Sequence, residues 1–316
     1  MFPFNIDPLG FGKASRVRSG PRPRSRKRAN IGSLFPPGWK AVKPELRSEI
    51  LNHYEQAAER ERLNIGPSQI EFVRTKDVIE RWIGDRRAIV VDVGGGPGAY
   101  ASWLAAHGHE VHLIDPVARH VEQAEALNAT SSRKMMSCSI GDARRLEWPD
   151  QSADVVLLLG PLYHLTDLSD RLQALTEARR ILKPGGLVFA AAISRFASAL
   201  DGLARDLFAD PRFEQIVEHD LKEGLHENPT SNLEYFTTAW FHRPEELELE
   251  IKAAGFLVLS ILGLEGPGWL FSDFDERWRD PRRRKDLLRI ARALEAEPAI
   301  QAVSAHLLAV GRREPE

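Results

Sequence analysis

The sequence is poor in cysteine, in long apolar runs and in net charge, and each shortage excludes a class of protein. Its 316 residues hold one cysteine, Cys138, and carry a formal net charge of −2. A single cysteine rules out a disulfide framework and any cysteine-based zinc or iron–sulfur cluster. The apolar runs are shorter than the ~20 residues of a membrane span, and none follows the basic N-terminal segment as in a signal peptide. We therefore expect a soluble, cytoplasmic protein without a membrane partner.

The near-zero net charge hides an uneven distribution. Residues 1–44 contain ten Lys or Arg and one acidic residue, a net of +9, which leaves −11 for the rest. A basic segment rich in Pro, Gly and Ser buries too little apolar surface to fold alone. We therefore expect a disordered tail over residues 1–44 and a single domain over residues 45–316. The basic tail could contact nucleic acid or an anionic surface, but the acidic character of the domain argues against a nucleic-acid partner.

From residue 88 onward, short apolar runs alternate with amphipathic, helix-like segments. The strand-like runs lie at 88–93, 110–114, 134–140, 154–159 and 187–193. This alternation predicts right-handed βαβ units and a parallel sheet. Two later strands, at 256–264 and 305–311, flank a helical segment and suit a final antiparallel hairpin. The pattern predicts a Rossmann-like, doubly wound α/β fold with a seven-stranded, mostly parallel sheet whose last strand is antiparallel.

The predicted core that binds a cofactor covers residues 68–193. Residues 45–66, 194–243 and 265–300 are predicted to be helical lid insertions over the carboxyl edge of the sheet, where ligands bind in such folds. The segment 226–242 is rich in aromatic and polar side chains, which suit the wall of a pocket for a planar or hydrophobic molecule. Packing of the lid onto the sheet explains these residues equally well.

A glycine-rich loop follows the first predicted strand. Gly94, Gly96 and Ala99 match the pattern G-x-G-x-x-[GA] between a strand and a helix. Such a loop lets the backbone turn tightly and approach an anionic group at the helix N-terminus. Asp115 ends the second strand about 20 residues on, where a carboxylate can accept from both hydroxyls of a ribose. This pattern fits an NAD(P)-dependent oxidoreductase as well as other proteins that bind an adenosine cofactor.

Two further acidic residues separate these alternatives. Asp92 lies two residues before the first glycine, where a second carboxylate repels a pyrophosphate but suits an ammonium or a sulfonium. Asp142 follows the third strand, where an acid can accept from an adenine amino group. The residues at 182–186, LKPGG, predict an abrupt end to a helix directly before a buried strand.

With these motifs assembled, the sequence resembles the class I S-adenosylmethionine-dependent methyltransferases. The closest resemblance is to the small-molecule branch with a "type 11" domain, found in ubiquinone and menaquinone biosynthesis. The matching segments lie within residues 88–193, in the family's order and spacing: VVDVGGGPGAY, VHLIDP, GDARRL, DVVLLLGPLYHL and LKPGGLVFAAAI. The resemblance implies S-adenosylmethionine as cofactor and a small-molecule acceptor methylated at O, N or C.

The resemblance also implies where the methionine part of the cofactor would bind. It would face Asp92, Gly94 and Gly96. Arg74, in the preceding helix, would pair with its carboxylate, because a guanidinium binds a carboxylate through two hydrogen bonds. A solvated helix charge is the alternative for Arg74. Tyr54 lies in an N-terminal helix of the kind that closes over the cofactor in similar proteins.

The rest of the cofactor is placed by the same resemblance. The ribose would bind at Asp115, and the adenine at Asp142 and Ala143. Leu159 and Gly160, at the end of the fourth strand, would flank the sulfonium.

The residues after the fourth strand are the candidates for the chemistry. His164 is a candidate general base, because an imidazole can take a proton near neutral pH. Tyr163 would form a wall beside the methyl group, although both side chains also suit purely structural roles. The sequence Gly160-Pro161-Leu162-Tyr163 lacks the polar-Pro-Pro-aromatic motif of relatives that methylate amino groups of adenine or glutamine, which argues against a nucleobase acceptor.

Four further points complete this interpretation. No metal is implied, because no cluster of Asp and Asn ligands follows the fourth strand. The oxidoreductase alternative lacks a Tyr-x-x-x-Lys pair, and a cofactor-binding protein without transferase activity is a further alternative. The oligomeric state is left open.

Overall fold

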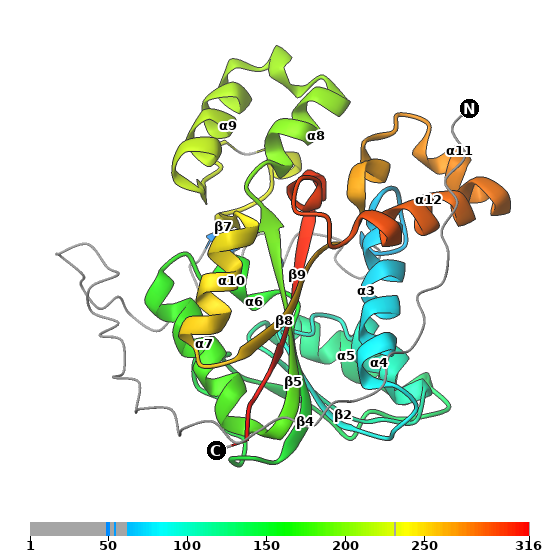
Figure 1. The fold of residues 1–316 in the computed structure, drawn as a ribbon, viewed down its shortest axis with the longest axis vertical. Helices are drawn as coiled ribbons and strands as arrows, with labels where there is room; N and C mark the ends of the chain where they lie inside the picture. The colour runs from blue at the N-terminus through cyan, green and yellow to red at the C-terminus, as the bar shows by residue number, and fades with distance from the viewer. Residues whose placement is uncertain (1–48, 51–53, 55–61, 231, 316) are drawn as a thin grey trace, which may run out of the picture. The chain divides into compact units, whose positions relative to one another are not determined.

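The computed structural model describes residues 49–50, 54, 62–230 and 232–315, all within one unit of the chain, residues 43–316. The predicted tail over 1–44 lies outside the described residues, as does most of the predicted insertion at 45–66. In the described part, nine strands form one sheet (Figure 1). They are β1 (Ile89–Val93), β2 (Glu110–Asp115), β3 (Ser137–Ile140), β4 (Ala153–Leu158), β5 (Leu182–Ser194), β6 (Leu225–His226), β7 (Ala239–His242), β8 (Leu257–Gly263) and β9 (His306–Arg312).

The order of the strands confirms the predicted doubly wound topology. Strands β3, β2, β1, β4 and β5 are neighbours in that order and run parallel. The final hairpin is antiparallel, because β9 pairs antiparallel with both β5 and β8. These seven strands are the ones predicted. The winding changes direction between β1 and β4, which is where ligands bind in open α/β sheets.

Strands β6 and β7 are additions that the sequence pattern did not predict. β7 continues the sheet in parallel beside the last two residues of β5, and β6 pairs antiparallel with β7. They contain two and four residues. Such short strands carry no period-2 pattern of their own, and the sequence predicts a helical insertion for their segment.

The helices cover both faces of the sheet. Helices α3, α4 and α5 pack on one face, and α7 and α10 on the other (Figure 1). Strand β5 is therefore buried on both faces. Its neighbouring residues Val188 and Phe189 are both fully buried, Val188 on the face of α7 and α10 and Phe189 on the face of α3, α4 and α5. A strand buried on both faces is apolar throughout rather than alternating. The helices are α3 (Ser68–Ile83), α4 (Ala99–Ala106), α5 (Ala118–Thr130), α6 (Pro161–His164), α7 (Leu168–Ile181), α8 (Ala197–Arg205), α9 (Pro211–Glu223), α10 (Pro244–Ala253), α11 (Phe274–Arg279) and α12 (Pro281–Leu294).

The segment at 182–186 does more than end a helix. Helix α7 ends at Ile181 and β5 starts at the next residue, so the glycines lie inside the strand. The pairing with β4 shifts in register between Ala153 and Val155, which accommodates the extra residues as a bulge. Gly185 there has a positive φ of 81° and donates its amide to the carbonyl of Arg313 at 2.8 Å.

A buried ion network joins α7, α10 and β7. Arg171 is 2% exposed, and its guanidinium is 2.8 Å from Glu250, which is 7% exposed. The Nε2 atom of His242 is 3.3 Å from the other oxygen of Glu250. Arg171 also donates to the carbonyls of Leu165 and Thr166 at 2.9 Å. The network therefore fixes the connection between α6 and α7, next to the end of β4.

The aromatic segment 226–242 packs mainly against α9 and against its own residues. His226 is 1% exposed, and it hydrogen-bonds Asp220 at 2.8 Å and the carbonyl of Tyr235 at 2.7 Å. Its ring stacks on Phe241 at 4.8 Å. Packing thus explains these side chains better than the predicted role as a pocket wall.

None of the described helices has both the length and the apolar character needed to cross a membrane.

Candidate functional site

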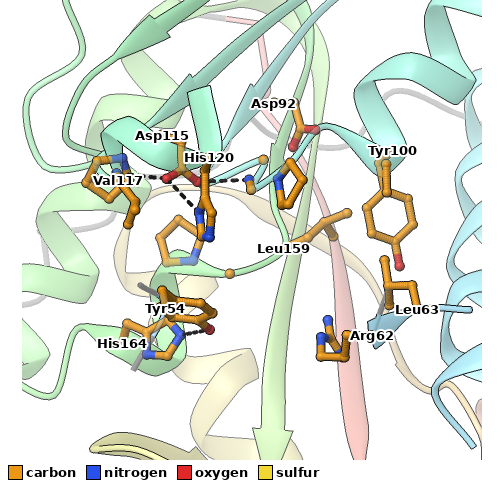
Figure 2. A pocket seen from close by; sticks show the side chains of 18 of the residues that line it. Tyr54, Arg62, Leu63, Asp92, Tyr100, Asp115, Val117, His120, Leu159 and His164 are labelled. Atoms are coloured by element: carbon orange, nitrogen blue, oxygen red, sulfur yellow. Dashed lines mark hydrogen bonds and ion pairs between the residues drawn. The ribbon is translucent and has the colours of Figure 1, made fainter. Parts of the chain in front are cut away.

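A cavity of about 580 Å³ opens at the carboxyl ends of β1, β2 and β4, where the winding of the sheet changes direction. Figure 2 shows side chains that line it. The cavity brings together eleven of the twelve residues that the sequence predicts for the site: Tyr54, Asp92, Gly94, Gly96, Asp115, Asp142, Ala143, Leu159, Gly160, Tyr163 and His164.

The twelfth residue, Arg74, corrects the prediction, because it does not line this cavity. It is 2% exposed on α3, and its guanidinium forms ion pairs with Asp77 and with Glu295, which follows α12. Sequence spacing places Arg74 in a helix, but the packing of α12 on α3 decides which face it occupies. Two arginines do line the cavity, Arg62 and Arg144, and sequence reasoning missed both.

Two backbone amides of the glycine loop donate hydrogen bonds that tie the loop to the end of β2. The amide of Gly94 donates to the carbonyl of Ile114 at 2.7 Å, and the amide of Gly96 donates to the carboxylate of Asp115 at 2.8 Å. Both glycines have positive φ, 71° and 55°. A Cβ atom at Gly94 would lie 2.7 Å from the ring of Pro161, whereas one at Gly96 would meet nothing within 4 Å. The first glycine therefore allows the close approach of β1 to α6.

Replacing Gly94 by alanine is expected to lower the free energy of unfolding by about 2–4 kcal/mol, from the left-handed backbone together with overpacking against Pro161. Gly96→Ala is the matched control, because it has the same backbone requirement without the clash, and we expect a loss of about 1 kcal/mol. Urea unfolding of both variants measures the difference. Equal losses would contradict the close approach.

Asp92, in β1, is a buried carboxylate at the edge of the loop. It is 0% exposed, and no group in the described part of the chain donates a well-formed hydrogen bond to either of its oxygens. Burial, reinforced by the negative charge of Asp115, raises its pKa to about 7, against a smaller opposing effect of the Ala101 amide. This acid is therefore poorly stabilised as an anion unless a cation lies beside it.

Asp115 is also buried, but unlike Asp92 it accepts well-formed hydrogen bonds. One oxygen accepts from the amide of Val117 at 2.9 Å and from Nδ1 of His120 at 3.1 Å, and the other accepts from Gly96. The carboxylate thus joins the glycine loop to the start of α5. His120 also lines the cavity, and it was missed although it lies five residues after Asp115, in the first turn of the same helix.

The residues that follow β3 and line the cavity are Asp142, Ala143 and Arg144. The guanidinium of Arg144 pairs with Asp142 at 2.6 Å and with Asp170 at 2.7 Å. The Asp142 carboxylate is thereby kept in a fixed orientation at the cavity wall.

An aromatic cluster lies around α6, where Tyr54, Tyr163 and His164 line the cavity. The hydroxyl of Tyr54 is 2.6 Å from Nε2 of His164, and the two rings meet edge to face at 5.2 Å. The rings of Tyr163 and Phe236 lie 4.6 and 6.0 Å from that of His164. A tyrosine hydroxyl and an imidazole joined in this way can move a proton.

Among the residues that the structure describes, one group of charged side chains has the spacing of metal ligands: Glu71, Glu265 and His306. Arg62 donates to Glu71 at 2.9 Å, and His306 is 2.6 Å from Glu265. Although burial alone would lower it, the two carboxylates raise the pKa of His306. Two anions and two cations already balance, so the donor set does not call for a metal ion.

Comparison with known proteins points to one family. A model of a methyltransferase domain matches residues 91–190. A ubiquinone biosynthesis O-methyltransferase from Pseudomonas syringae pv. tomato is 32% identical over 191 residues, which are 58% of this chain and 72% of that protein. One from Azorhizobium caulinodans is 27% identical over 214 residues, 63% of this chain and 73% of that protein. The fold is similar to that of an S-adenosylmethionine-dependent methyltransferase from Mesorhizobium loti, with a TM-score of 0.51 and 15% identity over 77% of this chain and 100% of that one.

Proposed function

Because the chain belongs to the class I S-adenosylmethionine-dependent methyltransferases, we propose that it methylates O, N or C of a small-molecule acceptor in the cavity between β1, β4 and α6. The observation that carries this proposal is that a single cavity has two chemically different walls. One wall presents the buried carboxylates Asp92 and Asp115, and the other presents the Tyr54–His164 pair.

The residues present fit the cofactor. A cavity of about 580 Å³ is within the range of about 300–1,000 Å³ usual for small-molecule sites. The uncompensated carboxylate of Asp92 suits a cationic ligand and disfavours the pyrophosphate of a dinucleotide, so the oxidoreductase alternative is not favoured. We assign the ribose to Asp115, the adenine to Asp142 and Ala143, and the methionine carboxylate to Arg62 in place of Arg74.

S-adenosylmethionine supplies a methyl group that is already activated on a sulfonium. The protein therefore has to align the acceptor, exclude water and, for an acceptor that holds its proton near neutral pH, remove that proton. We assign the alignment to Leu159, Gly160 and Tyr163, at the end of β4. We assign the proton to the Tyr54–His164 pair, in which either group can accept it while the other holds the hydrogen bond.

We further propose that the acceptor is not a nucleic acid and that the protein works in the cytoplasm. The net charge of −11 outside residues 1–44 supports the first of these, because a polyanion is repelled by an acidic body.

Calorimetric titration tests the cofactor, and a panel of phenols, amines and carboxylic acids with methyl-labelled S-adenosylmethionine tests the acceptor. We expect S-adenosylmethionine and S-adenosylhomocysteine to bind and NADH not to bind. We expect transfer to a member of the panel. Binding of NADH with no binding of either S-adenosyl compound would overturn the proposed function.

His164→Ala is expected to lower kcat for a hydroxyl or amine acceptor about 10²–10⁴-fold, the usual contribution of a general base. Tyr54→Phe, which keeps the ring and loses the hydroxyl, should reproduce part of this loss. His219→Ala, on the exposed side of α9, is the control for the loss of a histidine. The affinity for S-adenosylhomocysteine should change less than about threefold in His164→Ala. An unchanged kcat in both site variants would show that the pair is structural.

A further inference from the structure

His120 is a buried histidine that lines the cavity, with one ring nitrogen hydrogen-bonded and the other without a partner among the described residues. The residue is 4% exposed, in the first turn of α5. Its Nδ1 lies 3.1 Å from the carboxylate of Asp115. Its Nε2 is buried and has no hydrogen-bond partner among the described residues. Buried polar atoms are nearly always hydrogen-bonded, so this nitrogen is a strong indication of a ligand.

The hydrogen bond to Asp115 determines what Nε2 can do. A carboxylate only accepts, so Nδ1 carries the hydrogen, and in the neutral form of the ring Nε2 is then an acceptor. The Tyr54 ring packs edge to face against His120 at 5.3 Å and holds it in this orientation. In Figure 2 the imidazole lies next to the Asp115 carboxylate, on the side of Tyr54. The cavity therefore presents two adjacent acceptors, a carboxylate and an imidazole nitrogen.

We propose that Asp115 and His120 together recognise the vicinal diol of the cofactor ribose, one hydroxyl donating to the Asp115 carboxylate and the other to Nε2 of His120. The assignment rests on the proposed function, which places the ribose at Asp115. It adds a residue that the sequence motifs did not identify. Asp115 already accepts three hydrogen bonds from the protein, from Val117, Gly96 and His120, so a second acceptor for the diol relieves crowding at the carboxylate.

The pairing also explains why a histidine suits this position. An imidazole can donate at one nitrogen and accept at the other, about 2 Å apart across the ring, so it extends the reach of Asp115 without adding a negative charge. A second carboxylate there would increase the repulsion that Asp92 already experiences from Asp115.

The test is a comparison of ligands by calorimetry with the full-length protein. The probes are S-adenosylhomocysteine and its 2′-deoxy and 3′-deoxy analogues, titrated into wild type, His120→Ala and the control His219→Ala. For S-adenosylhomocysteine we expect His120→Ala to weaken binding about tenfold, the usual cost of one buried hydrogen bond. For the analogue that lacks the hydroxyl paired with His120, wild type and His120→Ala should bind equally, while the other analogue should keep the tenfold difference.

The same loss for all three ligands would overturn the proposal, because His120 would then act through packing alone. No loss with S-adenosylhomocysteine would overturn it as well. Failure of the wild type to bind S-adenosylhomocysteine would instead overturn the proposed function, and this inference with it. Circular dichroism and thermal unfolding of His120→Ala, compared with His219→Ala, establish that the variant is folded.

Discussion

Replacing Glu250 by alanine is expected to lower the free energy of unfolding by about 3–5 kcal/mol, a large part of the stability of a typical domain. The reason is that Arg171, 2% exposed, would keep its charge and lose the carboxylate 2.8 Å away. His242, 0% exposed, would lose the same partner. Although burial opposes ionisation, His242 and Arg171 lower the pKa of Glu250, so the glutamate is charged at neutral pH.

Urea unfolding at pH 7 measures this loss. Glu248→Ala, on an exposed part of the same helix, is the control for removing a glutamate from α10. The double variant Arg171→Met with Glu250→Leu removes both charges, and we expect it to be markedly more stable than Glu250→Ala. If Glu250→Ala lost less than about 1 kcal/mol, this would contradict the view that the buried Arg171 depends on Glu250 for its stabilisation.

This network also bears on the proposed active site, because Arg171 binds the carbonyls of Leu165 and Thr166 directly after His164. Loss of Glu250 therefore removes a restraint from the turn that carries the proposed base. Stability and catalysis should both suffer in Glu250→Ala, whereas His164→Ala should affect catalysis alone.

The elements around the glycine loop were predictable because their signals are local. A buried parallel strand is an apolar run, the loop needs glycine at positive φ, and an acid at the end of the next strand falls beside it by topology. These rules brought Asp92, Gly94, Gly96 and Asp115 to one cavity without any knowledge of distant contacts.

Arg74 and Arg62 show the limit of prediction from local sequence patterns. Both lie in or before the first helix of the core, and both have the chemistry to bind a carboxylate. What separates them is Glu295, about 220 residues further on, which pairs with Arg74 on the side of α3 that faces α12. No periodicity in the sequence contains that contact. The pairing of Arg171 with Glu250 escaped prediction for the same reason.

Asp92→Asn is expected to change how stability depends on pH. The pKa of Asp92 is about 7 in the folded protein and about 4 in the unfolded chain. Between these values the folded state binds the proton and the unfolded state does not, so the free energy of unfolding falls as the pH rises. The fall approaches about 1.4 kcal/mol per pH unit, reaches at most about 4 kcal/mol, and stops above pH 7. The asparagine variant should lack this component.

Urea unfolding at intervals of one pH unit from 5 to 9 gives the comparison. We expect the stability of wild type relative to Asp92→Asn to decrease from pH 5 to 7 and to be constant from 8 to 9. Asp275→Asn, exposed on α11, should run parallel to wild type throughout. A constant difference between wild type and Asp92→Asn would show that the Asp92 carboxyl is not perturbed.

Binding of the cofactor should offset the free energy that the folded protein loses when Asp92 ionises. A sulfonium or ammonium beside Asp92 favours its charged form and lowers its pKa, so binding releases a proton below pH 7. The affinity of wild type for S-adenosylmethionine should therefore rise from pH 5 to 7 and then level off, whereas Asp92→Asn should bind more weakly and show no such rise.

S-adenosylhomocysteine lacks the sulfonium charge, so its affinity should depend less on pH than that of S-adenosylmethionine. If both ligands responded alike, the charge sensed by Asp92 would be the ammonium that they share, and the carboxylate would not distinguish substrate from product. A steeper response to S-adenosylmethionine would mean that the acid which destabilises the empty protein also favours the charged cofactor over its spent form.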